Sequence, residues 1–287
     1  MRDAMIGIIG GSGLYAIDGL EGAEWVSVDS PWGAPSDQIL RGQLAGVPVA
    51  FLPRHGRGHR HSPTTINYRA NIDALKRVGV TDILSFSACG SFREEMAPGD
   101  FVLVDQFIDR TFGREKSFFG TGCVAHVSVA EPTCARLRGA LAAAGIEGVH
   151  VGGTYLAMEG PQFSTLAESR LYREQWGADV IGMTNMPEAK LAREAEICYA
   201  TIAMVTDYDS WHPDHGEVDI TAILRTMHAN VDKAKAMIAA VVPALGGPRG
   251  PCPQGCDRAL EYAILTAPEA RDPALLARLD AVAGRVL

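Results

Sequence analysis

Short apolar runs alternate along this chain with segments that repeat their apolar residues at helical spacing. The runs have the length of strands and show no alternation of apolar and polar residues, as expected for strands buried on both faces. They lie at Met5 to Ile9, Val49 to Leu52, Ile83 to Ser87, Phe101 to Val104, Val151 to Met158, Val180 to Met183 and Ile197 to Val205. Such strands must be covered by helices on both sides, so the alternation predicts an α/β fold.

Four segments between or after these runs have helical period. The clearest begins at Ile220, where Ile223, Leu224 and further apolar residues up to Val241 predict one buried helix face. The others are Asn67 to Val78, Thr133 to Ala144 and Ser164 to Trp176, the last with Ser164 as a candidate N-cap. A Gly- and Pro-rich turn follows the long helix, so we expect one domain over residues 1–245 and a tail over residues 246–287. The tail is too short for its own core and should dock on the same domain or on a neighbouring subunit.

Charge and hydropathy exclude several classes of protein. The chain has 26 Lys and Arg against 34 Asp and Glu, a formal charge of −8, which argues against a nucleic-acid binder. The apolar stretch Ala234 to Leu245 contains Lys235 and Pro243 and is too short to cross a bilayer, so we expect no membrane association. The six cysteines are scattered and the N-terminus does not resemble a secretory signal. We therefore expect a cytoplasmic protein with mostly reduced thiols.

Three segments that follow strands are rich in donors for an anion. Gly10-Gly-Ser-Gly offers backbone amides and the hydroxyl of Ser12, Arg54 and His55 follow the next strand, and Ser87 with Ala88 opens a third small-residue turn. Because carboxyl ends of parallel strands meet at one edge of a sheet, these segments predict a single anion pocket. A purely structural turn and a solvated basic loop are the alternatives.

Other interpretations of the same segments are less favourable. Gly11 to Ala16 formally fits a dinucleotide fingerprint, but the residues after it break the helix that a pyrophosphate needs. A metal held by His55, His59 and His61 is disfavoured by the arginines between them. Cys89 has no evident catalytic partner, and we interpret it as a packed small residue rather than a nucleophile.

The strand ends after residue 158 carry side chains suited to a nucleoside. Phe163 could stack on a base and Glu159 could bind ribose hydroxyls; alternatively, Phe163 is core and Glu159 caps a helix. Met183 and Thr184 lie at another strand end, where the alternative is a simple helix entry.

Asp207 and Asp209 end the apolar strand that begins at Ile197. On an extended chain, residues i and i+2 point the same way, so we expect the two like charges to raise the pKa of at least one carboxylate. A carboxyl group of that kind can donate a proton. The alternative is an acidic cluster at the start of the following helix.

The ordered series of motifs resembles the S-methyl-5′-thioadenosine phosphorylases of the trimeric purine nucleoside phosphorylase superfamily. The motifs cover about residues 5 to 245 and include Gly10-Gly-Ser-Gly, Arg54-His-Gly, Asn67-Tyr-Arg-Ala-Asn, Ala88-Cys-Gly-Ser, Met158-Glu-Gly-Pro-Gln-Phe-Ser, Met183-Thr-Asn-Met-Pro-Glu and Thr206-Asp-Tyr-Asp. The resemblance implies a single α/β domain with a mixed, mostly parallel central sheet, assembled as a homotrimer or a homohexamer. It also implies phosphorolysis of methylthioadenosine to adenine and 5-methylthioribose 1-phosphate, with phosphate as co-substrate and no metal or organic cofactor.

The resemblance implies a role for each candidate residue. Phosphate would be bound by Ser12, Arg54, His55, Ser87, Ala88 and Thr184. The base and ribose would contact Phe163, Met183, Asp207 and Asp209, with Asp207 as the catalytic proton donor to N7 and Asp209 accepting from the 6-amino group. The 5′-methylthio group would meet Ile220, Ile223 and Leu224, and His126 from the neighbouring subunit. Cys252 and Cys256 resemble cysteines that pair in a subset of microbial relatives, and their Cys-x-x-x-Cys spacing leaves that pairing open.

The alternatives to this activity are two related phosphorylases and one protein that is not an enzyme. One is a broader 6-aminopurine nucleoside phosphorylase that accepts adenosine or 5′-deoxyadenosine. Another is a methylthioinosine phosphorylase, which prefers a 6-oxo base. The two aspartates, Asp207 and Asp209, argue against that preference. A non-catalytic purine-binding protein is the alternative outside the enzymes.

Overall fold

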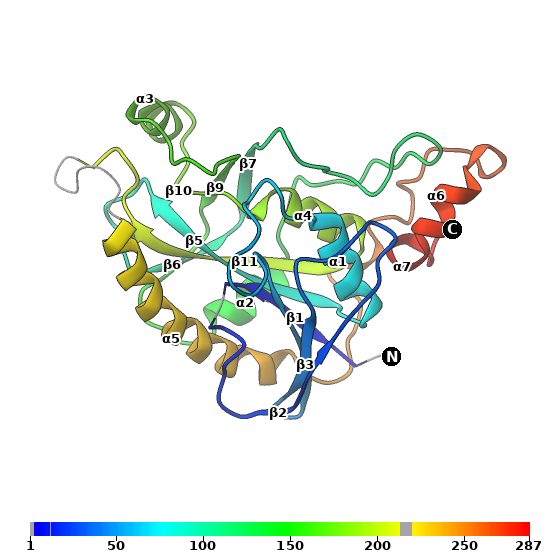
Figure 1. Cartoon of the computed structure of the whole chain (residues 1–287), viewed down its shortest axis with the longest axis horizontal. Helices are drawn as coiled ribbons and strands as arrows, with labels where there is room; N and C mark the ends of the chain where they lie inside the picture. Colours follow the sequence, from blue (N-terminus) through cyan, green and yellow to red (C-terminus); the bar gives the residue numbers. More distant parts are fainter. Residues whose placement is uncertain (1–2, 12, 213–219) are drawn as a thin grey trace.

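The computed structural model describes residues 3–11, 13–212 and 220–287 and contains one mixed sheet with helices on both faces (Figure 1). The strands are β1 (Ile6–Gly10), β2 (Leu20–Val26), β3 (Ile39–Leu44), β4 (Val47–Pro53), β5 (Asp82–Ser91), β6 (Phe101–Val104), β7 (Gln106–Arg110), β8 (Val149–Val151), β9 (Thr154–Met158), β10 (Val180–Gly182) and β11 (Cys198–Asp207). Their order is β2-β3-β4-β1-β5-β10-β9-β7, and β11, β6 and β8 continue from the other edge of β5. Six of the ten strand pairs among the described residues are parallel, which confirms a mixed, mostly parallel sheet.

Strand β5 is the central strand of this sheet and pairs with three others, because its neighbour changes part-way along one edge. Its first half pairs in parallel with β1 up to Ser85, opposite Ile9. Beyond that point β10 takes the same edge in the antiparallel sense, with Val180 opposite Ser91. On the other edge β11 runs parallel to β5 over almost its whole length. The ends of β1 and β10 therefore meet beside the middle of β5, and this junction positions the candidate site.

The helices cover the two faces of the sheet and enclose two large hydrophobic cores, and a smaller third cluster forms around Phe92 and Tyr172. One core contains residues of α1 (Tyr68–Arg77) and α4 (Asn185–Glu194), including Ile72 and Leu191. The other contains residues of α2 (Ala135–Ala142) and α5 (Ile220–Leu245), including Leu137 and Ile238. Burial of apolar side chains on both faces is what the continuous apolar strands require. None of the described helices is long and apolar enough to cross a membrane.

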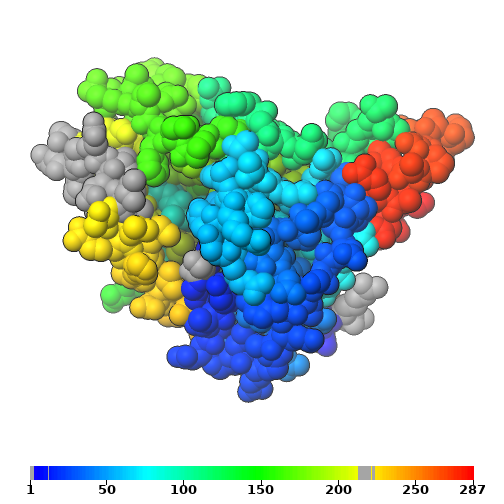
Figure 2. All heavy atoms as spheres, in the orientation of Figure 1, coloured from blue at the N-terminus to red at the C-terminus, as the bar shows by residue number. Residues whose placement is uncertain are grey.

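The C-terminal tail packs against its own chain. After the short helical turns Cys256–Arg258 and Pro268–Ala270 it forms α6 (Pro273–Arg278) and α7 (Asp280–Ala283), at the end of the molecule opposite α3 (Leu166–Arg170) (Figure 1). Leu260, Leu279 and Val282 are buried in the core that contains α1 and α4. The space-filling view shows the tail as one edge of the molecule (Figure 2). The backbone N–H of His126 donates to the carbonyl of Ala263 in this tail (2.9 Å).

Several local predictions were wrong. The expected turn from Ser87 to Ser91 is the second half of β5, because this segment is paired by β11 and β10. The run Val151 to Met158 is two strands, separated at Gly152 and Gly153. The N-cap of α3 is Thr165 rather than Ser164: the Thr165 hydroxyl accepts from the Glu168 N–H in a capping box, and α3 passes into a π-helical turn, Leu171–Gln175.

The long helix was also predicted to bury Leu224, which is 49% exposed in the single chain. The buried face of α5 begins one turn and more later, at Asn230 and Ala234. The first turns of the helix therefore extend beyond the core of this chain.

Candidate active site

Arg54 lies at the end of β4 inside a buried polar network. Its Nε donates to Glu188 Oε2 (2.8 Å), its Nη1 to the Phe86 carbonyl (2.7 Å) and its Nη2 to Ser85 Oγ (2.6 Å) and Glu188 Oε1 (3.1 Å). The side chains of Arg54 and Glu188 are each only 2% exposed. Burial alone would lower the pKa of Arg54, but the charge of Glu188 raises it, so the guanidinium stays charged. One Nη1 hydrogen of Arg54 has no partner among the described residues and remains available to a ligand.

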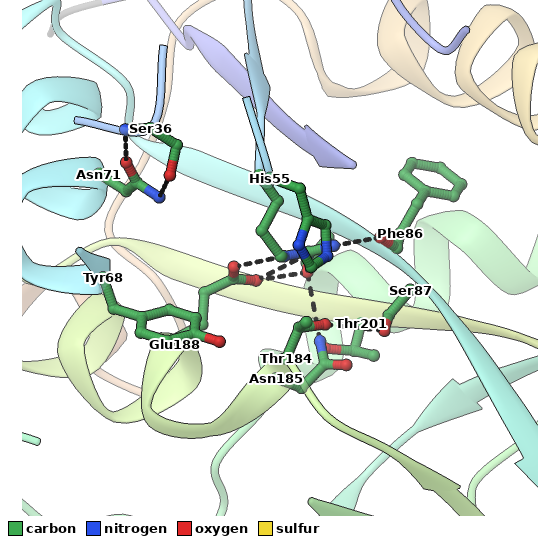
Figure 3. Close-up of polar contacts among 12 residues, drawn as sticks. Ser36, His55, Tyr68, Asn71, Phe86, Ser87, Thr184, Asn185, Glu188 and Thr201 are labelled. Carbon is green, nitrogen blue, oxygen red and sulfur yellow. Dashed lines mark hydrogen bonds and ion pairs between the residues drawn. The ribbon is translucent and has the colours of Figure 1, made fainter. Parts of the chain in front are cut away.

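Glu188 is the residue that sequence reasoning missed. Besides Arg54, its Oε1 accepts from the hydroxyls of Ser85 (2.6 Å) and Tyr199 (2.8 Å). Asn185 extends the network by donating to Ser85, Tyr199 and Thr201. The contacts around Glu188, Asn185 and Phe86 are drawn in Figure 3. The motif Met183-Thr-Asn-Met-Pro-Glu contains both Asn185 and Glu188, but no pattern in the sequence pairs Glu188 with Arg54.

Ser87 and Thr184 bring two hydroxyl groups together across the β5–β10 junction. Their oxygen atoms lie 2.9 Å apart, and both side chains are 5% exposed. Thr184 precedes α4 and makes no capping hydrogen bond with its side chain, so its hydroxyl faces Ser87 instead of the helix. Ala88 follows Ser87 on β5 and is half-buried. Two hydroxyls and a charged guanidinium near the ends of β4 and β10 form a set of donors suited to an oxyanion.

His55 follows Arg54 and is half-buried. Its Nδ1 lies 2.8 Å from the His61 carbonyl, so Nδ1 must carry the proton and donate. Its ring stacks on that of His59 at 4.2 Å between centroids. Burial lowers the pKa of His55 to about 4, the hydrogen bond to the His61 carbonyl opposes this, and the charge of Arg54 adds to it. Neutral His55 therefore presents Nε2 as an acceptor, which differs from the donor expected from the sequence.

The first anion segment is only partly described. Strand β1 lies between β4 and β5, and the N–H of Arg54 donates to the carbonyl of Gly10 (2.9 Å). Ser12 falls outside the described residues. The next regular element among the described residues is strand β2, so the helix that a dinucleotide site requires does not follow Gly13.

Asp207 ends β11 opposite Gly90 of β5. Its carboxylate accepts from the Thr206 hydroxyl (2.7 Å) and from the Asp209 N–H (2.8 Å). The pKa of Asp207 is raised chiefly by burial, against which these two hydrogen bonds act, while the charge of Asp209 adds to the rise. The direction agrees with the sequence prediction, but the main cause is burial rather than the neighbouring charge.

Asp209 does not continue the strand as the i, i+2 argument assumed. Its φ is +50°, so the chain turns after Asp207 and the two carboxylates do not share one face of β11. Both oxygens of Asp209 accept from the Ser164 hydroxyl (2.8 and 2.7 Å). A side chain at Gly90 would come within 3.0 Å of the Asp207 Oδ1 and 3.2 Å of the Asp209 Cβ, so glycine makes room for both aspartates there. Ser164 thus positions Asp209 instead of capping α3.

Glu159 fits neither of its sequence interpretations. Its oxygens accept from Thr64 Oγ1 (2.6 Å), Arg114 Nε (3.0 Å) and the N–H groups of Phe112 (2.6 Å) and Gly113 (3.1 Å). Burial would raise its pKa, but these four donors hold it at about 2. The carboxylate is saturated by donors that fix residues 112–114, so it neither caps α3 nor has capacity for ribose hydroxyls.

Phe163 and Met183 lie on the more open side of the site. Phe163 is 49% exposed and so is not a core residue. Met183 is half-buried, and its carbonyl accepts a hydrogen bond from Arg114. Cys89 is 3% exposed, and burial raises its pKa well above the ordinary value, which fits a packed residue rather than a nucleophile.

The residues expected around the 5′-group are not brought together within one chain. Leu224 is exposed near the start of α5, whereas exposed His126 is bonded to the tail that leads into α6. The start of α5 and the part of the tail around α6 lie at opposite ends of the molecule (Figure 1). Ile220 and Ile223 are in the first turns of α5, and their side chains are outside the described part of the structure.

Comparison with known proteins agrees with this geometry. Residues 5–243 match the phosphorylase superfamily. The chain is 72% identical over 287 residues to the S-methyl-5′-thioadenosine phosphorylase of Cereibacter sphaeroides, covering 99% of this chain and 98% of the relative. A methylthioadenosine phosphorylase from an Antarctic soil metagenomic library superposes with a TM-score of 0.89 at 48% identity, covering 97% of this chain and 98% of that one.

A second solved structure is the adenosine/methylthioadenosine phosphorylase of Schistosoma mansoni, in a variant bound to methylthioadenosine. It has a TM-score of 0.76 and 36% identity over 84% of this chain and 91% of its own. The family match spans most of the sequence, and near full-length similarity extends from sequence to fold. This chain belongs to the phosphorylase superfamily.

Proposed function

We propose that the chain catalyses phosphorolysis of S-methyl-5′-thioadenosine, giving adenine and 5-methylthioribose 1-phosphate. The relatives with this name match the chain over nearly its full length. The observation that carries the proposal is that β5 runs past both the anion donors and Asp207. Ser87 faces the anion donors, and Gly90, three residues on, lies opposite Asp207. Three strand residues span about 10 Å, a distance that a ribose joined to a phosphate and a purine can bridge.

Phosphate is proposed to bind against Arg54, Ser87, Thr184 and the N–H of Ala88, with Ser12 completing the donors. His55 would accept from the protonated oxygen of monohydrogen phosphate, because its own proton is held by the His61 carbonyl. This arrangement orients a phosphate oxygen toward the anomeric carbon.

At the other end, protonated Asp207 would donate to N7 as the bond from N9 to the anomeric carbon breaks. A phosphate oxygen then forms the new bond to that carbon, and neutral adenine leaves. Asp209, held by Ser164, would accept from the 6-amino group, and Phe163 would stack on the base or sugar. Transfer of the proton within the site offsets negative charge on the departing purine. The proposal needs no metal or organic cofactor in this step.

The 5′-methylthio group is proposed to lie against Ile220, Ile223 and Leu224 of one subunit and His126 of the next. The separation of Leu224 and His126 within one chain supports assembly into a trimer, with a hexamer as the alternative. An apolar pocket favours the methylthio group over a hydroxyl by about 1 to 3 kcal/mol. Turnover of adenosine and 5′-deoxyadenosine should therefore be weaker, not absent. We place the enzyme in the cytoplasm.

The deciding experiment is adenine release from methylthioadenosine with and without phosphate. A phosphorylase requires phosphate and forms methylthioribose 1-phosphate in equal amount. Equal release in phosphate-free buffer would show hydrolysis, and tight purine binding without turnover would show a binding protein. Sedimentation of the same sample measures the oligomer, and a fully active monomer would contradict the role of His126.

A further inference from the structure

Four cysteines converge where the C-terminal tail meets the main body of the protein. Cys134 is the N-cap of α2, Cys198 begins β11, and Cys252 and Cys256 flank the turn after the long helix. Their four Sγ atoms lie within 4.8 Å of one another, and every one of these side chains is at most 2% exposed. We propose that these four cysteines bind one zinc ion in a closed structural site.

The spacing of the sulfur atoms suits an ion between them. Cys134 Sγ lies 3.7 Å from Cys252 Sγ. Four sulfurs arranged as a tetrahedron with zinc–sulfur bonds of about 2.3 Å are roughly 3.8 Å apart. A disulfide requires about 2.05 Å between sulfur atoms, and all four cysteines are free in the structure. The Cys252–Cys256 pairing that the sequence left open is thus not formed here.

Two arginines contact sulfur atoms of the cluster, of which Arg249 also forms ion pairs with Asp82 and Asp257. Arg249 Nη2 lies 3.0 Å from Cys198 Sγ, and Arg193 Nη2 lies 3.8 Å from Cys256 Sγ. Cys134 is the N-cap of α2 and so lies at the positive end of the helix dipole. Hydrogen bonds and positive charge lower the cost of deprotonating the thiols and orient them as ligands. Each thiol gives its proton to solvent as its bond to zinc forms.

The tail is shaped so that both of its cysteines face the body. Gly255 has a φ of +70°, and its N–H donates to the Cys252 carbonyl (2.9 Å), which closes the turn between the two cysteines. The Cys252 N–H donates to Asp257 Oδ2 (3.0 Å). The Gln254 side chain also accepts from the first N–H of α2, at Ala135, beside Cys134. The turn is therefore tied to α2, the helix whose N-cap is Cys134.

The ligand set also indicates which ion and which role. Four thiolates select a soft or borderline metal, and a buried four-sulfur site leaves no position for substrate or water. Cys198 and Asp207 occupy opposite ends of β11, about 30 Å apart for ten strand residues. The ion would therefore stabilise the tail on the body and take no part in phosphorolysis.

Elemental analysis of the full chain tests this inference. The protein is made without a metal-affinity tag and purified in a reducing buffer free of chelators. We expect about one zinc per chain. Replacement by Co²⁺ should give the thiolate charge-transfer and visible bands of tetrahedral cobalt. Cys252→Ser and Cys256→Ser should each lower the bound zinc at least about tenfold, whereas Cys123→Ser, at a buried cysteine outside the cluster, should keep it.

Three results would overturn the proposal. The first is wild-type protein without zinc that also takes up neither Zn²⁺ nor Co²⁺ under reducing conditions. The second is a disulfide among the four cysteines found by non-reducing peptide mapping of freshly purified protein. The third is unchanged zinc content in the Cys252 and Cys256 variants. If those variants fail to fold, the zinc count and the cobalt spectrum of the wild type decide the question.

Discussion

The phosphate end and the purine end of the proposed site are built in different ways. Arg54 at the end of β4, Ser85 on β5 and Glu188 on α4 are buried and satisfy one another through short hydrogen bonds. Phe163 and Leu224 at the purine and 5′ end are about half exposed in one chain. The single subunit therefore preorganises the anion pocket, whereas the nucleoside pocket depends on exposed side chains and, as proposed, on a second subunit.

The largest effect is expected for Asp207→Asn, which removes the proposed proton donor at the purine end. Activity on methylthioadenosine should fall about 10²- to 10⁴-fold. Some activity on methylthioinosine should appear, because the NH2 group of an amide at position 207 has two hydrogens and can donate to N7 and to a 6-oxo group. Steady-state kinetics on both nucleosides measure this, with Asp209→Asn as the comparison.

Asp209→Asn should lose less activity than Asp207→Asn, because Asp209 is proposed to bind the base without supplying the proton. A wild type that prefers methylthioinosine, or an Asp207→Asn variant with its 6-amino rate intact, would contradict the role of Asp207.

Glu188→Gln tests preorganisation at the phosphate end. The variant leaves the buried Arg54 charge without its counter-ion, which should cost about 3 to 5 kcal/mol of unfolding free energy. Added phosphate supplies the missing negative charge, so it should raise the melting temperature of this variant more than that of the wild type.

Glu194→Gln is the matched control for this experiment. Glu194 is also buried and belongs to the same helix, α4, but it accepts from Ser117 and the Phe118 N–H rather than from an arginine of the site. Its variant should show no extra stabilisation by phosphate. Equal phosphate shifts in both variants would mean that the Arg54–Glu188 pair does not contact the anion.

Phe163→Ala should have a smaller effect at the exposed end. Loss of stacking should raise the KM for methylthioadenosine about fivefold, or roughly 1 kcal/mol, with little change in kcat. The melting temperature should not change, since Phe163 is 49% exposed. Phe112→Ala, at a side chain 84% exposed, is the control and should leave KM unchanged. A large loss of stability in Phe163→Ala would indicate a packing role instead.

The smallest effect concerns the pH dependence of folding through His55. Its folded pKa of about 4 lies below the ordinary 6.5, so its stabilising contribution is present above pH 6.5 and is lost as pH falls towards 4. The partial exposure of the ring limits this loss to the order of 1 kcal/mol.

Denaturant unfolding of the wild type and of His55→Asn at pH 7.5 and 4.5 measures the effect. The amide of Asn can still donate to the His61 carbonyl but does not titrate. The variant should therefore lose less stability between these pH values, and parallel losses would argue against a low pKa for His55.

The sequence predicted the parts of the fold that local patterns encode. The apolar strand at Phe101–Val104 and helices α1, α2 and α5 were placed to within a few residues because their burial shows in their periodicity. Strands β2, β3 and β7 were missed because they are partly exposed and carry polar residues such as Glu24, Arg41 and Gln106. Helix α4 was considered only as a possible helix entry after Thr184, because nearly all of its residues are buried, including the charged Glu188 and Arg193, so its polar residues do not mark an exposed face.

Most of the candidate site residues were visible from the sequence, but their partners were not. Ser87 and Thr184 were singled out separately, and the structure brings their hydroxyls into contact. Glu188 and Ser164 act through residues distant in sequence, Arg54 and Asp209, and only tertiary folding shows such pairs. The i, i+2 argument for Asp209 was wrong because it assumed an extended chain where the backbone turns.

The paired state of Arg54 bears on how the enzyme would respond to salt. Arg54 and Glu188 together carry no net charge, so the proposed anion pocket should attract phosphate through short-range hydrogen bonds more than through a long-range field. Dissolved ions screen a field over distances near 10 Å but hardly affect hydrogen bonds inside a buried pocket. The affinity for phosphate should therefore change little with ionic strength. The enzyme would keep its affinity for this co-substrate as the salt content of its surroundings varies.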